Sequence, residues 1–296
     1  MKIWIEPSAL SGETENLLPP TALYGMKSLL EAGYELTIPT KELSETQQTL
    51  LLNEDIQSSD FPKGKEDGVI TLESGQLIFK KGNDLFATAE SWHQLCRNIL
   101  YPVRKTTLTR NTKETQISLS LNLDGTGQSS INTGVVFFDH MLDQIARHGL
   151  IDLELTCKGD LEVDEHHTIE DCAIALGSAI RTAISKNKAG IQRYGFVLPM
   201  DEAQATVAID LSDRPYLRWE VNLSREYVGD FPTEMLEHFF YTLAMNAKAT
   251  LHVKADGKNE HHIIESIFKG FAKALRFAIS RNERIKGILP STKGTI

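Results

Sequence analysis

The sequence predicts an α+β protein in which residues 104–296 form duplicated sheet-plus-helices halves, preceded by a small α/β region at residues 1–103. Two observations predict the duplication. The phrase DEHHTIED at 164–171 returns as NEHHIIES at 259–266, and each phrase follows a helix-like segment that carries a histidine, His140 before the first and His238 before the second. A third observation divides the chain, because Pro102 interrupts a helical pattern and places a boundary near 101–105.

Composition narrows the class of protein. Of the 296 residues, 41% are hydrophobic and 24% are charged, which is typical of a chain with a packed core. A net charge of −9 argues against a nucleic-acid partner, because phosphate binding needs a basic face. No apolar run reaches the roughly 18 residues of a membrane span, so no membrane partner is expected. The three cysteines lack CxxC spacing, which favours a reduced, cytoplasmic protein.

The first region alternates strand-like and helix-like segments and is acidic, with 8 Lys/Arg against 15 Asp/Glu in residues 1–100. Its Pro19-Pro20 pair predicts a helix start, since proline is tolerated in the first turn. Ser74-Gly75 predicts a hairpin turn. The expected elements, in order, are a strand at 2–6, a helix at 19–34, a strand at 35–40, a hairpin of 69–73 with 76–80, and a helix at 90–100.

The second region repeats a helix–strand–helix unit, so we expect two repeats at about 104–195 and 196–296. His238 follows His140 by 98 residues, and His261 follows His166 by 95 residues. Helices in each half are expected to cover one face of a sheet. The expected units are 137–149, 151–160 and 162–180, followed by 232–247, 250–259 and 260–275.

The repeated histidines predict metal sites. Residues four apart share one face of a helix, so His166 with Glu170 can bind one ion, and so can His261 with Glu265. The adjacent histidines project about 100° away and can reach a different ion. A single HH pair is more often a surface feature or part of a hydrogen-bond network, and it is the duplication of the whole pattern that points to metal.

The candidate ligands are six imidazoles and two carboxylates, which divide evenly into two sites of three His and one Glu. Such ligands suit Mn, Fe or Zn better than Mg or Ca. His148 and His252 lie outside the pattern, and ordinary surface or core placement is expected for them. The candidate ligands are His140, His166, His167, Glu170, His238, His261, His262 and Glu265.

Over residues 104–296 the chain resembles the imidazoleglycerol-phosphate dehydratase family of histidine biosynthesis. The resemblance is carried by FFDHMLDQIARHG, DEHHTIEDCAIALG, PMDEA, DRPYL, EHFFYTLA, KNEHHIIESIFKGFAKAL and PSTKGTI. It implies a duplicated fold like that of ribosomal protein S5 domain 2. It also implies a hydro-lyase that converts D-erythro-imidazoleglycerol phosphate, a phosphorylated imidazole, to imidazole acetol phosphate.

The resemblance further implies two Mn²⁺ ions per active site, in a homo-oligomer of twenty-four subunits whose ligands come from more than one subunit. One implied ligand set is His140, His167, His261 and Glu265, and the other is His166, Glu170, His238 and His262. The two metals would stabilise an imidazolate as Lewis acids. Expulsion of the hydroxyl would then leave a diazafulvene, which acidifies the neighbouring C–H for a base.

Glu114 matches the family's glutamate near the start of this region and is the expected base, with Glu170 as the alternative. By the same resemblance, the expected phosphate ligands are Arg193, Arg214, Ser291 and Lys293. Asp213 stands where the family commonly has Gly. Asp tolerates a positive φ, but its charge beside a phosphate puts the role of Arg214 in question.

The first region faintly resembles a histidinol phosphatase of the haloacid-dehalogenase type. That family needs an Asp nucleophile and a second Asp directly after the first strand, where this chain has Glu6-Pro7-Ser8-Ala9. We therefore expect a phosphatase that is residual or lost, with the region serving as an acidic appendage or interaction module.

Two other functions fit part of the pattern. Paired metals also serve hydrolases, although those tend to use bridging carboxylates rather than six imidazoles. A non-enzymatic metal-binding assembly is the third reading, and the Arg, Ser and Lys candidates together with Glu114 argue against it.

Overall fold

The computed structural model describes residues 1–11, 17–59, 61–185 and 190–281. The chain divides into two compact units, Met1–Val103 and Arg104–Ile296. Across these described stretches, no helix has both the length and the apolar content needed to cross a bilayer.

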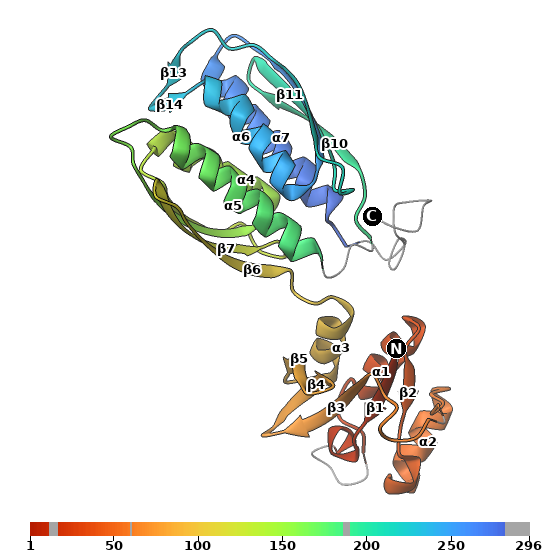
Figure 1. Cartoon of the computed structure of the whole chain (residues 1–296). Helices are drawn as coiled ribbons and strands as arrows, with labels where there is room; N and C mark the ends of the chain where they lie inside the picture. Colours follow the sequence, from red (N-terminus) through yellow and green to blue (C-terminus); the bar gives the residue numbers. More distant parts are fainter. Residues whose placement is uncertain (12–16, 60, 186–189, 282–296) are drawn as a thin grey trace. The chain divides into compact units, whose positions relative to one another are not determined.

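The first unit is built on a five-stranded sheet in the order β2-β1-β3-β4-β5 (Figure 1). Strand β1 (Lys2–Ile5) pairs in parallel with β2 (Glu35–Thr37) and β3 (Gly68–Glu73). Strand β4 (Gln76–Lys81) forms the expected hairpin with β3, and β5 (Asp84–Ala89), which the sequence analysis did not predict, extends the sheet. The α/β character expected for this region is confirmed.

Helix α1 of this unit begins later than the sequence predicts. It covers Ala22–Glu31, whereas Pro19-Pro20 indicated a start at residue 19. Thr21 has φ of +63°, which is outside the helical range and separates the prolines from the helix. The Thr21 hydroxyl instead accepts a hydrogen bond from the His93 amide at 3.1 Å. The prediction of a proline first turn was therefore wrong.

The remaining helices of the first unit begin at conventional caps. Helix α2 (Glu45–Asn53) was not predicted, although Ser44 and Gln47 form a capping box that is visible in the sequence. Helix α3 (Trp92–Leu100) is capped by the Ser91 side chain and confirms the expected closing helix. Two short 3₁₀ turns, η1 (Pro7–Leu10) and η2 (Thr40–Glu42), complete the described elements of this unit.

The second unit contains two four-stranded sheets with the same topology. In each, three strands form an antiparallel array, and the remaining strand joins the last of them in parallel. Along the chain, a small hairpin of β13 (Tyr227–Val228) and β14 (Phe231–Pro232) separates the parallel strand of the second sheet from the next helix. The first sheet is β6 (Lys105–Asn111), β7 (Thr115–Asn122), β9 (Asp152–Gly159) and β8 (Ser129–Asn132), and the second is β10 (Tyr194–Met200), β11 (Ala203–Asp210), β15 (Thr250–Asp256) and β12 (Tyr216–Val221).

Four helices form a layer between these two sheets (Figure 1). Helices α4 (Val136–Gly149) and α5 (His166–Ser185) belong to the first half, and α6 (Glu234–Ala247) and α7 (Glu260–Ala278) belong to the second. Helix α5 packs on α6, and α4 packs on α7, so both helix pairs cross from one half to the other. The repeated strand and helix order confirms the predicted α+β fold of two similar halves.

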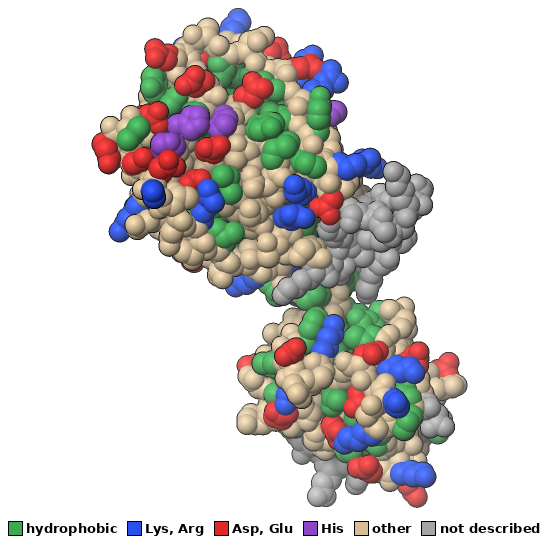
Figure 2. Space-filling view, in the orientation of Figure 1, with side chains coloured by type: hydrophobic (Ala, Val, Ile, Leu, Met, Phe, Trp, Pro, Cys, Tyr) green, Lys and Arg blue, Asp and Glu red, His purple; other side chains and the backbone are tan. Residues whose placement is uncertain are grey.

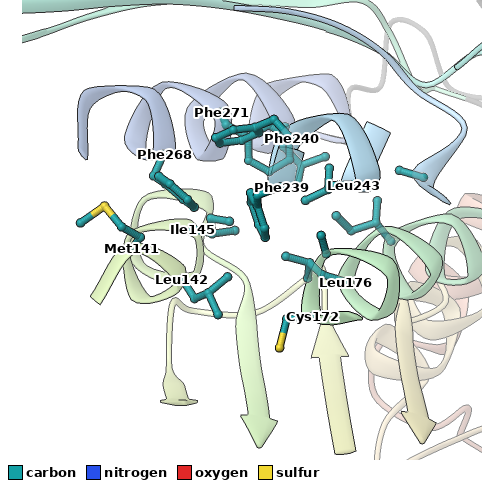
Figure 3. Packing of buried hydrophobic residues seen from close by; sticks show 14 of the residues in the cluster. Met141, Leu142, Ile145, Cys172, Leu176, Phe239, Phe240, Leu243, Phe268 and Phe271 are labelled. Carbon is teal, nitrogen blue, oxygen red and sulfur yellow. The ribbon is translucent and has the colours of Figure 1, made fainter. Parts of the chain in front are cut away.

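Aromatic residues fill the centre of the helix layer (Figure 3). Phe239 and Phe240 on α6 lie with ring centroids 5.4 and 5.0 Å from Phe268 on α7. All three side chains are fully buried. Each such burial stabilises the fold by about 1.5–3 kcal/mol, so the helices that carry the candidate ligands rest on a rigid core.

Helices α5 and α6 approach unusually closely at Gly177. A Cβ at this position would lie 2.6 Å from the Leu243 carbonyl oxygen and 2.9 Å from the Asn246 Cβ. Because backbone atoms cannot move aside cheaply, only glycine allows this contact. The close packing brings side chains of α5 and α6 within reach of one another.

Arg104 and Asp124 join the start of the second unit to its last helix. The Arg104 backbone amide and guanidinium donate hydrogen bonds to Asp124, and Arg104 Nη1 donates to the Ile279 carbonyl at 2.7 Å. Arg281 Nη2 lies 3.0 Å from Asp124 Oδ2. Burial alone raises the pKa of Asp124, but the hydrogen bonds and charge of Arg104 outweigh it and leave the pKa below its usual value.

Asp124→Asn is expected to lower the free energy of unfolding of the metal-free protein by about 2 kcal/mol at pH 7, because the ionised carboxylate loses its arginine partners. A depressed folded-state pKa contributes stability above the unfolded pKa of about 3.9, and that contribution is lost as pH falls through the folded value. The difference between wild type and variant should therefore shrink below about pH 4. Urea denaturation at several pH values, monitored by hydrogen exchange in β7 and β9, measures this difference in the free energy of unfolding. A difference that does not change with pH would contradict the ion pair between Asp124 and Arg104.

Candidate metal centre

Each paired-histidine motif opens a helix of the second unit. The His166 amide donates to the Asp164 carboxylate at 2.9 Å, and the His261 amide donates to the Asn259 side chain at 3.0 Å. A polar residue two positions before the first histidine therefore caps the helix in both halves. This places each HH pair in a first turn.

Three predicted ligands meet between helices α5 and α6, and we call them the α5–α6 group: His166, Glu170 and His238. Glu170 Oε1 lies 3.2 Å from His238 Nε2, and Glu170 Oε2 lies 3.8 Å from His166 Nε2. The two imidazole centroids are 4.9 Å apart. The i,i+4 spacing of His166 and Glu170 brings both side chains to the face that meets α6.

Three more predicted ligands meet between α4 and α7, and we call them the α4–α7 group: His140, His261 and Glu265. His261 Nε2 lies 3.1 Å from Glu265 Oε2, and His140 Nε2 lies 3.8 Å from Glu265 Oε1. Asp230 positions α4, because its carboxylate accepts the amides of Val136 and Phe137 at the helix start. Figure 2 shows histidine side chains gathered on this unit with acidic side chains beside them.

The chemistry of both groups fits a transition-metal ion. His238 Nε2 is buried and has no hydrogen-bond partner among the described residues, although Glu170 Oε1 is 3.2 Å away. A buried ring nitrogen without a hydrogen-bond partner is costly, and a bound cation would satisfy it. Burial alone raises the pKa of Glu265, but Lys269 and the nearby imidazoles lower it below its usual value, which keeps the carboxylate ionised.

The second histidine of each pair lies apart from these groups in the same chain. His167 Nδ1 lies 3.1 Å from an Asp160 oxygen, and His262 Nδ1 lies 2.9 Å from Glu202 Oε2. A carboxylate on Nδ1 fixes the ring and leaves Nε2 as the free ligand atom. Each four-residue set expected from the sequence is therefore present as three grouped ligands and one separate histidine.

These carboxylates also shift the proton affinity of their partners. The hydrogen bond that His167 donates to Asp160 raises the pKa of His167, and the one that His262 donates to Glu202 raises the pKa of His262. In return, the His262 hydrogen bond lowers the pKa of Glu202 to about 2. An imidazole made more basic in this way is also a stronger metal donor once it is deprotonated.

Glu114, the expected base, lies in the turn between β6 and β7. Its side chain is 52% exposed, and its Oε1 lies 3.8 Å from His167 Nε2. The corresponding turn of the second half, between β10 and β11, carries Glu202 beside His262. Glu114 is thus close to one predicted ligand, with its carboxylate open to an approaching molecule.

The two phosphate candidates among the described residues, Arg193 and Arg214, lie at the other end of the helices. Arg193 Nε donates to Asp210 Oδ2 at 2.7 Å, and Arg214 Nη2 lies 3.7 Å from the same oxygen. The structure therefore brings these two arginines together on Asp210. Ser291 and Lys293, the other two expected phosphate ligands, lie outside the described residues.

Asp213 adopts the conformation that glycine would favour and also finds a cation. Its φ is +57°, in the left-handed region that Asp tolerates. Its Oδ1 lies 3.8 Å from Arg181 Nε on α5. The negative charge introduced beside Arg214 is therefore offset by a third arginine.

Three residues that the sequence analysis did not single out belong to this centre. Lys269 Nζ lies 2.8 Å from Glu265 Oε1, and its i,i+4 spacing from Glu265 was a visible signal. Glu202 lies in the PMDEA segment, where the sequence alone does not indicate its contact with His262. Asp160 carries no local signal, because only the fold brings it to His167.

Comparison with known proteins agrees with this architecture. The family profile of imidazoleglycerol-phosphate dehydratase matches residues 133–275. The imidazoleglycerol-phosphate dehydratase of Desulfitobacterium hafniense is 52% identical over 196 residues, which cover 66% of this chain and 99% of that protein. The crystal structure of imidazoleglycerol-phosphate dehydratase from Staphylococcus aureus matches with a TM-score of 0.55 and 37% identity, covering 60% of this chain and 99% of that one.

Longer relatives share the same region. The histidine biosynthesis bifunctional protein HisB of Spirosoma linguale is 52% identical over 205 residues, or 69% of this chain and 53% of that protein. The Bacteroides fragilis protein of the same name is 47% identical over 226 residues, or 76% of this chain and 60% of its own length. The chain thus spans only about half to three fifths of these bifunctional relatives.

The fold and the grouped side chains define an α+β protein of two similar halves, with His–Glu groups formed where the helices of one half meet those of the other. The similarity to full-length relatives identifies its lineage. The chain belongs to the imidazoleglycerol-phosphate dehydratase family.

Proposed function

We propose that the second unit dehydrates D-erythro-imidazoleglycerol phosphate to imidazole acetol phosphate, as a hydro-lyase of L-histidine biosynthesis. The observation that carries this proposal is the pair of His–Glu groups, α4–α7 and α5–α6, set on a chain of this family. Imidazole-rich ligation favours binding of a nitrogen heterocycle at the metal over the bridging carboxylates typical of two-metal hydrolases.

The residues that would hold two Mn²⁺ ions are the two groups together with His167 and His262. Bound manganese would supply Lewis-acid stabilisation of negative charge on the substrate's imidazole. Glu114 would take the proton from carbon, because its carboxylate is exposed and lies beside His167, with 3.8 Å between Glu114 Oε1 and His167 Nε2. Arg193 and Arg214 would bind the phosphate as charge-assisted donors.

The active site would be assembled between copies of the chain. Arg181, which pairs with Asp213 next to Arg214, follows His166 by 15 residues on α5. At 1.5 Å per residue this places the arginines about 22 Å from the α5–α6 group, too far for one small substrate to span. His167 and His262 are likewise separate from the groups they would complete. A homo-oligomer, which the family resemblance puts at twenty-four subunits, would supply the arginines and the separate histidine of each site from a neighbouring subunit.

The same proposal assigns the enzyme to the cytoplasm. Cys96, Cys157 and Cys172 are free and buried, which is typical of proteins from reducing compartments.

The test is product formation from imidazoleglycerol phosphate by purified, Mn-loaded protein, with chelator-treated protein as the control. Metal-dependent appearance of imidazole acetol phosphate would support the proposal. No product from protein that carries metal in both sites would refute it.

For the first unit we propose that histidinol-phosphate phosphatase activity has been lost. At the end of β1, Glu6 Oε1 lies 2.8 Å from Lys63 Nζ, and Ser8 Oγ accepts the Leu72 amide at 3.4 Å. The residues at this edge are therefore paired within the unit, and neither aspartate needed for phosphoryl transfer is present at Glu6 or Ser8. An acidic appendage or interaction module is the role we propose instead.

We expect the full-length protein to release no phosphate from histidinol phosphate above the buffer blank, because no nucleophilic aspartate follows β1. Phosphate release with added Mg²⁺ is the measurement, and an unrelated acid phosphatase serves as the positive control. Hydrolysis that disappears in Glu6→Gln would show that this edge of the sheet still works as a phosphatase.

A further inference from the structure

Asp171 is a buried carboxylate directly beside a candidate metal ligand. It follows Glu170 on α5 but faces the first sheet, and its side chain is only 8% exposed. Arg110 on β6 donates to Asp171 Oδ1 from Nε at 3.1 Å and from Nη2 at 2.7 Å. The Thr115 hydroxyl donates to Asp171 Oδ2 at 2.5 Å. Such a desolvated carboxylate with several partners holds its neighbours firmly in place.

The same contacts lead to the turn that carries Glu114. Thr112 Oγ1 lies 3.4 Å from Asp171 Oδ2 and 3.2 Å from Thr115 Oγ1. Thr112 Oγ1 also accepts the amides of Glu114 at 3.1 Å and Thr115 at 2.9 Å. A continuous set of hydrogen bonds therefore runs from α5 to the backbone of Glu114.

In the part of the second half that the structure describes, this connection is absent. Ser266 follows Glu265 as Asp171 follows Glu170, but its hydroxyl donates to the Ile263 carbonyl within its own helix at 2.7 Å. The corresponding turn is held by Glu202 itself, whose carboxylate accepts the amides of Lys258 and Asn259. Both halves share one topology, so folding alone does not require the Asp171 connection. The Asp171 connection occurs in the first half, where the carboxylate of the turn glutamate, Glu114, does not hold the turn itself.

We propose that Asp171 is a positioning residue for the dehydration, acting through Thr112 and Thr115 to fix Glu114 relative to the ligands of α5. The inference rests on the proposed function of the second unit. Arg110 balances the buried charge, which would otherwise be costly at this depth. Glu114 can then keep an exposed, unencumbered carboxylate while its backbone stays in register with His167.

Asp171→Asn is expected to lower kcat by about 100-fold while KM stays within about twofold, because a displaced base loses proximity and binding does not involve it. Metal content and particle size should match wild type. Asp124→Asn is the matched control, since Asp124 is also an arginine-paired carboxylate of this unit and lies away from both groups. It should lose stability without losing kcat.

A second pair of variants guards against a simple folding defect. Thr112 is exposed, so its replacement leaves the core intact. Thr112→Val removes the acceptor of the Glu114 amide and should lower kcat by about tenfold. Thr112→Ser keeps the hydroxyl and should restore kcat to near the wild-type value.

Hydrogen exchange of residues 111–116 provides a readout that does not depend on activity. It should be faster in Asp171→Asn than in wild type or Asp124→Asn. If wild type forms no product, the proposed function fails. The exchange result alone then decides whether Asp171 holds the turn of Glu114 in place. Unchanged exchange, an unchanged kcat, or an equal loss of kcat in Asp124→Asn would each overturn it.

Discussion

His166→Ala is expected to abolish both product formation and assembly of the second unit into the proposed homo-oligomer. The change removes one of three donors from the α5–α6 group, in which His166 lies 3.8 Å from Glu170. Loss of one bound ion removes several kcal/mol of charge stabilisation, so kcat/KM should fall by at least about 1000-fold. Metal analysis of the purified protein, light scattering and product formation together measure the effect.

The control is His252→Ala. His252 is exposed on the outer face of β15, where it faces Tyr216 at a centroid distance of 6.5 Å and belongs to neither group. This variant should bind metal and turn over substrate like wild type. A His166→Ala protein that stays active with unchanged metal content would contradict the assignment of His166 as a ligand.

Glu114→Gln is expected to lower kcat by about 10²–10⁴-fold, because the amide keeps the size of the side chain and cannot accept the proton. Glu114 belongs to neither three-residue group, so metal content and particle size should stay at wild-type values. Steady-state kinetics with metal analysis tests both statements.

The competing base is Glu170, and the same measurements separate the two. Glu170→Gln should reduce metal content as well as kcat, since Glu170 contacts both imidazoles of the α5–α6 group. Glu154→Gln, an exposed change on the outer face of β9, is the matched control and should change neither. Retention of full activity by Glu114→Gln would rule it out as the base.

The duplicated architecture could be predicted from the sequence because it depends on local patterns of residues. Helical spacing brought His166 to the same face as Glu170, and the 95-residue repeat identified the second copy. The Ser74-Gly75 pair predicted the hairpin of the first unit. Thr21 was missed because its left-handed conformation depends on a contact with the distant His93 amide.

The division of the ligand sets could not be predicted in the same way. Spacing along a helix does not say which helix packs against which, and the groups form only because α5 meets α6 and α4 meets α7. The separation of the arginines from the metal groups follows from the length of α5 and the position of Asp213 at its far end. Asp171 gave no signal, since its partners are 56 and 61 residues away.

The pairing of helices across the two halves has a consequence for the origin of this chain. Each group takes its His–Glu pair from one half and its single histidine from the other, so neither half holds a complete group alone. An ancestor of half the length would have had to bind itself, and that dimer would already have held two identical groups. Once the two genes were joined, the two halves no longer had to have the same sequence. One half could then evolve the contacts that join Asp171 to the turn of Glu114, while the other has Ser266 at the matching position and holds its turn through Glu202.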